Sequence, residues 1–306
     1  MRRSLTQPLL LLSLLLAACG AAPGNSTPAG GARLNVVATL SILGDLVHTV
    51  AGEDIQLHTL VGPDGDTHTY EPIPADGVAL AQADLIFENG LGFETWLDKL
   101  YTASSSKARR VVVTTGVTAG KIGIGADAGR TDPHAWQDVT YAMGMVNIIR
   151  DTLAAQDPAH APAYQANAAA YLQQLQDLDV AIQQQAANVP AGRRKLVTNH
   201  DALGYFAKRY GFQVIGDVLG SVSTEASEPS AAEIARLIDE IKSAQVPAIF
   251  TENIENAAVI NQVAQEAGVK VAPALYTDAL GKPGTPGDSY LKMMRYNIDT
   301  IVAALK

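Results

Sequence analysis

From Leu34 onward the order of apolar and polar residues alternates between short strand-like runs and longer helix-like runs. In the first half, strands are predicted at 34–39, 56–60, 85–88 and 110–113, and helices at 42–50, 75–82, 93–101 and 138–153. In the second half, strands are predicted at 195–198, 213–215, 248–251 and 269–271, and helices at 202–210, 230–243, 257–267 and 290–305. This alternation predicts parallel sheets covered by helices.

One helical pattern is much longer than the rest and separates the two halves. It opens at Asp157-Pro158 and runs to about Ala187, roughly 45 Å of helix. Its buried face is predicted from apolar residues at helical spacing: Tyr164, Tyr171, Leu175, Leu178 and Ile182. Such a helix belongs to a bundle or crosses between two lobes, and we favour the crossing because no comparable partner helix is predicted. The predicted fold class is α/β, with two β/α lobes of mostly parallel sheets joined by one long backbone helix.

The N-terminus has the pattern of an export signal. Arg2 and Arg3 precede an apolar run at 9–16 that is too short to span a membrane. The sequence Leu-Ala-Ala-Cys that ends at Cys19 looks like a bacterial lipobox, in which cleavage leaves a lipid-bearing cysteine. An ordinary signal peptide with a chance cysteine is the alternative. The predicted organisation is a lipoprotein signal peptide at 1–18, a flexible tether at 19–33, an N-terminal lobe at 34–156, a linking helix at 157–188 and a C-terminal lobe at 189–306.

Composition narrows the function classes. The net charge of the chain is −9, and it becomes −11 when Arg2 and Arg3 leave with the signal. An acidic protein without a basic patch is a poor binder of nucleic acid. Cys19 is the only cysteine, so the mature chain has no disulfide within it and no thiolate metal site.

Four short polar segments carry the candidate chemistry, and each follows a predicted strand. They contain His68, His134, His200 and Asp278. Ligands of open α/β sheets bind beyond the carboxyl ends of the strands, so two candidates from each lobe could meet at one point between the lobes. We therefore predict that these four side chains close around one transition-metal ion.

The chemistry of this set suits holding an ion. Neutral imidazole binds zinc, iron, cobalt and, more weakly, manganese, and one carboxylate reduces the charge of the ion. Four protein ligands fill a tetrahedral shell and reserve no position for a reacting water. Nearby carboxylates could orient a ligating ring without touching the ion: Glu71, Asp132 and Asp201.

Other candidates have simpler interpretations. A single loop histidine is more often a surface or hydrogen-bonded group than a ligand. His48, His58 and His160 lie within predicted regular elements or at the start of one, so we assign them no role. Tyr70 and Trp136 are expected to pack.

At these segments the chain resembles the metal-binding solute-binding lipoproteins of manganese/zinc ABC transporters, the cluster A-I or TroA-like proteins, also called the adhesin family. The matching pieces are the lipobox at Cys19 and the segments 68–72, 132–136, 198–206, 228–230, 276–278, 287–290 and 293–297. Together they cover nearly the whole mature chain in order. The resemblance implies two α/β lobes joined by a rigid helix, a metal in the cleft, and His68, His134, His200 and Asp278 as ligands.

The resemblance also implies how the protein works. It implies an extracytoplasmic, lipid-anchored receptor, expected to be monomeric, that delivers Zn²⁺ or Mn²⁺, with Fe²⁺ less favoured, to a permease powered by an ATPase. Manganese-specific members often carry Glu at the third ligand position, where this chain has His200. Zinc-specific members often carry a His-rich loop, and neither 114–131 nor the loop around His68 is rich in histidine.

Two alternatives stay open from the residues themselves. A zinc hydrolase would use three histidines, a metal-bound water and Glu71 or Asp278 as base. A surface adhesin would use the metal to support its fold.

Overall fold

The computed structural model describes residues 33–121, 129–226 and 228–306. The predicted signal peptide, Cys19 and all but the last residue of the predicted tether therefore lie outside the described residues. Residues 33–306 form one compact unit. No helix in the described ranges combines the length and apolar character needed to cross a membrane.

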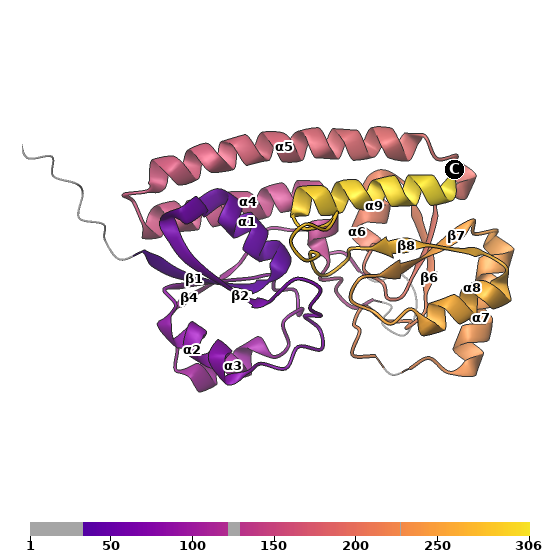
Figure 1. Cartoon of the computed structure of the whole chain (residues 1–306), viewed down its shortest axis with the longest axis horizontal. Coiled ribbons are helices and arrows are strands. Elements are labelled where there is room, and N and C mark those ends of the chain that lie inside the picture. The colour runs from indigo at the N-terminus through magenta and orange to yellow at the C-terminus, as the bar shows by residue number, and fades with distance from the viewer. Residues whose placement is uncertain (1–32, 122–128, 227) are drawn as a thin grey trace, which may run out of the picture. The chain divides into compact units, whose positions relative to one another are not determined.

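The N-terminal lobe is built on one four-stranded parallel sheet (Figure 1). The strands β1 (Leu34–Leu40), β2 (Ile55–Val61), β3 (Leu85–Glu88) and β4 (Arg109–Val112) take the order β2-β1-β3-β4. The accompanying helices are α1 (Ser41–Ala51), α2 (Pro74–Gln82) and α3 (Leu97–Ser104). Residues 36–40 of β1 are all buried, as expected for a central strand whose sheet is covered on both faces.

The C-terminal lobe repeats this plan with two parallel strand pairs. β5 (Lys195–Thr198) pairs with β6 (Gln213–Asp217), and β7 (Ala248–Glu252) pairs with β8 (Lys270–Leu275). Its helices are α6 (Gly204–Tyr210), α7 (Ala231–Ala244), α8 (Ala258–Ala267) and α9 (Tyr290–Leu305). In both lobes the strands run parallel, so their carboxyl ends lie at the same edge of each sheet.

The helix α5 (Ala161–Ala187) joins the lobes, as predicted, and its apolar stripe is buried. Figure 1 shows it running along both lobes, with α1 and α4 (Val139–Gln156) beneath one end and α9 beneath the other. The expectation that α5 lacks a comparable partner was wrong. α4 is 18 residues long and packs along α5, so this helix both crosses between the lobes and belongs to a helical layer.

Two helix starts differ from the prediction for local reasons. α3 begins at Leu97 rather than near residue 93, because the Glu94 carboxylate accepts hydrogen bonds from the backbone N–H groups of Asn89 and Gly90 and holds a turn there. α5 begins at Ala161, after a turn in which His160 Nδ1 lies 2.6 Å from Asp157 Oδ2.

Candidate metal centre

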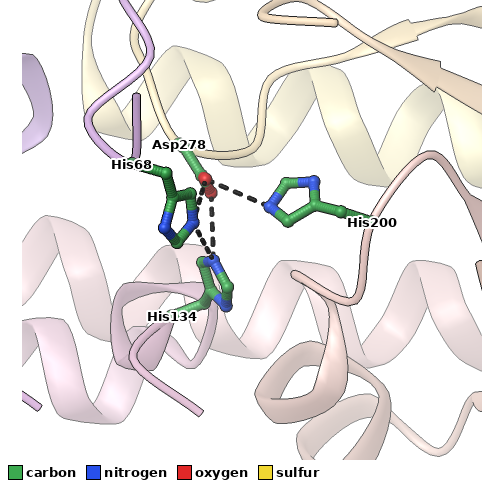
Figure 2. Close-up of side chains that lie close together, drawn as sticks. All are labelled: His68, His134, His200 and Asp278. Atoms are coloured by element: carbon green, nitrogen blue, oxygen red, sulfur yellow. Dashed lines mark hydrogen bonds and ion pairs between the residues drawn. The ribbon is translucent and has the colours of Figure 1, made fainter. Parts of the chain in front are cut away.

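The four predicted ligands come together between the two lobes (Figure 2). His68 lies in the loop after β2, and His134 lies just before a 3₁₀ turn, Ala135–Gln137. His200 is two residues beyond β5, and Asp278 is three residues beyond β8. His68 is 6% exposed and the other three are 0% exposed. Four segments distant in sequence thus place their polar groups in a place closed to bulk solvent.

The spacing of the ligand atoms is that of a coordination shell. His68 Nε2 lies 3.3 Å from His134 Nε2 and 3.2 Å from Asp278 Oδ2. Asp278 Oδ1 is 3.5 Å from His134 Nε2, and Oδ2 is 3.1 Å from His200 Nε2. One ligand atom from each residue lies within 4.8 Å of all the others. A tetrahedral ion with bonds of about 2.0–2.2 Å separates its ligand atoms by about 3.3–3.6 Å, and the four contacts of 3.1–3.5 Å lie close to that spacing.

Two of the three imidazoles are oriented by a carboxylate behind them. His134 Nδ1 lies 2.8 Å from Asp132 Oδ1, the oxygen that also accepts from the His134 backbone N–H. His200 Nδ1 lies 2.7 Å from Glu252 Oε2. An ionised carboxylate can only accept, so each Nδ1 carries a proton and each Nε2 is the nitrogen that faces the other candidate ligands. Nε2 becomes available to an ion once it has lost its own proton.

Among the carboxylates proposed to orient a ring, Asp132 contacts a predicted ligand, the imidazole of His134. Glu71 is exposed, and no contact with a ligand ring is recorded for it or for Asp201 within the described residues. Asp201 is 5% exposed, and burial together with the charge of Asp132 raises its pKa to about 6. Sequence reasoning missed Glu252. It ends β7, and its place at a strand exit was the one signal that could have found it.

His68 is held in a different way from the other two histidines. Its backbone N–H donates to Asp66 Oδ1 at 2.9 Å, and its ring meets the edge of Phe93 at a centroid distance of 4.6 Å. Asp66 Oδ2 accepts from the hydroxyls of Thr69 at 2.7 Å and of Thr224, in the other lobe, at 2.6 Å. Asp66 is therefore one attachment of the His68 loop to the C-terminal lobe, and Asp64, whose backbone N–H donates to the Leu280 backbone O at 2.8 Å, is another.

The electrostatics of the metal-free cluster are dominated by Asp278. Burial would raise the pKa of this carboxyl, but the facing His134 and His200 hold it well below its usual range. Burial works against protonation of His134, yet Asp278 and Asp132 outweigh it and raise that pKa to about 9. Burial prevails at His68 and lowers its pKa. At neutral pH the site thus presents an anionic carboxylate beside protonated imidazoles of His134 and His200.

The residues given simpler interpretations lie as expected. Trp136 Nε1 donates to the backbone O of Thr277 at 2.8 Å, and the Tyr70 hydroxyl donates to Asp76 at 2.7 Å. Three other histidines are exposed and outside the cluster: His48, His58 and His160.

Fold and cluster define the class of protein: a two-lobed α/β binding protein with one connecting helix and a buried polar site at the strand ends of both lobes. The family described as "Zinc-uptake complex component A periplasmic" matches residues 36–304, and the chain belongs to this family. It is therefore the extracytoplasmic substrate-binding component of a metal ABC transporter, whose partners are a permease and an ATPase, and not an enzyme.

Individual relatives agree along the whole length. "Manganese-binding lipoprotein MntA" of Halalkalibacterium halodurans is 37% identical over 297 residues, which cover 97% of this chain and 96% of that protein. The periplasmic zinc binding protein TroA from Treponema pallidum superposes with a TM-score of 0.83 at 35% identity, covering 90% and 99% of the two chains. The Mn-bound periplasmic metal binding protein from Candidatus Liberibacter asiaticus gives 0.79 at 30% identity, covering 90% and 100%.

Proposed function

We propose that His68, His134, His200 and Asp278 bind one divalent transition-metal ion, which the protein captures outside the cytoplasm and delivers to its permease. The proposal depends on one observation: buried nitrogen and oxygen atoms of four side chains from both lobes lie within 4.8 Å of one another, close enough to face a single ion. No side chain of another type is needed to complete a tetrahedral shell.

The same four-residue geometry suits a protein that holds an ion for transport and does not use it to catalyse a reaction. A catalytic zinc site keeps one position for water, whereas four protein ligands fill a tetrahedral shell. Family membership also supports transport over hydrolysis and over a purely structural metal. Release of the ion then requires the displacement of at least one ligand at the permease.

Zinc and manganese are the proposed cargo. Relatives are described as manganese-binding or zinc-binding, and a set of three imidazoles and one carboxylate suits both ions. On affinity alone zinc exceeds manganese at a site of this type. The ion carried in the cell then depends on supply as well as on the ligands.

We further propose that the mature protein is a monomer anchored through lipid on Cys19. The proposal is supported by the lipobox and by relatives that are named lipoproteins. Several acyl chains anchor a protein stably where one chain would not.

Calorimetric titration of the mature protein with Zn²⁺ and Mn²⁺ tests the ligand assignment. His68→Ala and Asp278→Ala should each weaken binding by more than the roughly 10–100-fold lost when an outer partner of a ligand is removed. His160→Ala is the matched control, because that imidazole is exposed and already paired with Asp157. Equal affinity of all three variants would refute the assignment.

A further inference from the structure

We propose that Glu252 is a positioning residue that connects two of the four ligands. It fixes the imidazole of His200 and holds the loop that carries Asp278. Glu252 ends β7 and is 3% exposed. The inference rests on the proposed metal site and adds to it a residue that does not touch the ion.

Glu252 contacts His200 at two positions, the backbone and the ring. Glu252 Oε1 accepts from the His200 backbone N–H at 2.9 Å, and Oε2 lies 2.7 Å from Nδ1 of the same residue. The Nδ1 contact is bent, and no other acceptor is recorded for this nitrogen within the described residues. One carboxylate thus restrains both the backbone and the ring, so that Nε2 points at Asp278 Oδ2, 3.1 Å away.

The second half of the connection runs through Thr277. Its hydroxyl donates to Glu252 Oε2 at 2.8 Å, and both it and the adjacent Asp278 are 0% exposed. The Thr277 backbone O accepts from Trp136 Nε1 and Gln137 Nε2 at 2.8 and 2.9 Å. These two residues follow His134 closely in sequence, so the connection continues into the N-terminal lobe.

The carboxylate of Glu252 acts on His200 and Thr277 through its charge and its hydrogen bonds as well as by packing. A buried carboxylate is costly unless its oxygens are satisfied, and here both receive donors from ligand-bearing segments. A carboxylate behind a ligating imidazole raises the basicity of the ring and holds its orientation. Asp132 does this for His134, and Glu252 is its counterpart in the other lobe.

The test compares Glu252→Gln with Glu255→Gln in the mature protein, titrated with Zn²⁺ and with Mn²⁺. Both variants replace a glutamate of the same region. Burial and the charge of Glu252 raise the pKa of Glu255 to about 7, so the titrations are run at about pH 8, where Glu255 is mostly charged in the wild type. Glu255 is only half-buried, and no contact of its carboxylate with a ligand is recorded among the described residues. Glu252→Gln should weaken binding of both ions about 10–100-fold. Glu255→Gln should change it no more than about threefold, because solvent screens the longer-range charge.

A spectroscopic measurement separates positioning from support of the fold. In ¹H–¹⁵N spectra of the zinc-loaded wild-type protein, the Nδ1 proton of His200 should be shifted downfield and protected from exchange with water. Thr277→Val should keep that proton protected while weakening ion binding, because it frees only the Asp278 loop. Both results are available even if Glu252→Gln does not fold.

Two results would overturn the inference: equal affinities of Glu252→Gln and Glu255→Gln, or an unprotected Nδ1 proton in the loaded wild-type protein. Failure of the proposed metal site would give a different set of affinities. If His68→Ala binds ions as the wild type does, the four-residue site itself is wrong. If His68→Ala loses binding while Glu252→Gln retains it, only the role of Glu252 is wrong.

Discussion

The pH dependence of ion binding follows from the charges in the four-residue site. In the metal-free protein, burial disfavours protonated His134, but Asp278 and Asp132 outweigh it and raise its pKa to about 9. The pKa of His200 is raised well above its usual value because Glu252 and Asp278 outweigh burial in the same way. An imidazole nitrogen has to lose its proton before it binds an ion, so protons and ions compete at neutral pH.

The size of the effect follows from the raised pKa. At pH 7 an ion displaces the His134 proton against a pKa about 2 units higher, which costs about 2.7 kcal/mol and weakens apparent binding about 100-fold. Because a raised pKa keeps the ring protonated below that value, binding strengthens as pH rises. The gain is about tenfold per pH unit for each proton displaced, and the part due to His134 ends near pH 9.

Calorimetry with Mn²⁺ between about pH 6 and 8, in buffers of different ionisation enthalpy, counts the protons released. One proton comes from His134 and a second from His200, so we expect a release of between one and two per ion. His160→Ala is the control: Asp157 raises the pKa of that exposed histidine as well, but it lies outside the cluster. Affinity that does not vary with pH, with no proton released, would refute this reasoning.

Two further predictions concern other parts of the molecule. Thr224→Val removes the hydroxyl that attaches Asp66 to the C-terminal lobe, a contact worth about 1 kcal/mol, so stopped-flow transfer of the ion to a chelator should be about fivefold faster. Thr115→Val, at an exposed hydroxyl in the N-terminal lobe, should leave the rate unchanged, and equal rates for the two variants would contradict the prediction. Leu175→Ala in the buried face of α5 should lower the free energy of unfolding by about 2.7–5 kcal/mol in denaturant titration. Gln174→Ala, on the exposed face of the same helix, should change it by less than about 0.5 kcal/mol, and a similar loss in both would count against burial as the cause.

Much of the fold could be predicted because the local signals are strong. β3 and β5 occur at the predicted residues, since apolar strands buried in a parallel sheet stand out between polar turns. The packing of α4 against α5 could not be predicted in the same way. The apolar spacing of α5 shows that one face is buried but does not say which helix covers it.

In the candidate site, too, some residues could be predicted from the sequence and others could not. His68, His134, His200 and Asp278 were predictable as a group because each follows a strand, and the parallel sheets gather the strand ends. Glu252 was not found, because its partners His200 and Thr277 lie far from it in sequence. A contact of that kind depends on which strands are neighbours, and the strand pattern alone does not order the strands.

The proposed ion site needs residues from both the early and the late part of the folded chain. His68 lies in the loop after the second strand, and Asp278 lies beyond the last strand, followed only by a short loop and α9. A polypeptide still being synthesised or exported therefore presents isolated histidines of ordinary weak affinity until its final segment has folded back onto the first. On the proposed ligand assignment, tight metal binding therefore requires a completely folded chain. Chains that end before residue 278 should bind the ion more weakly than the full-length protein.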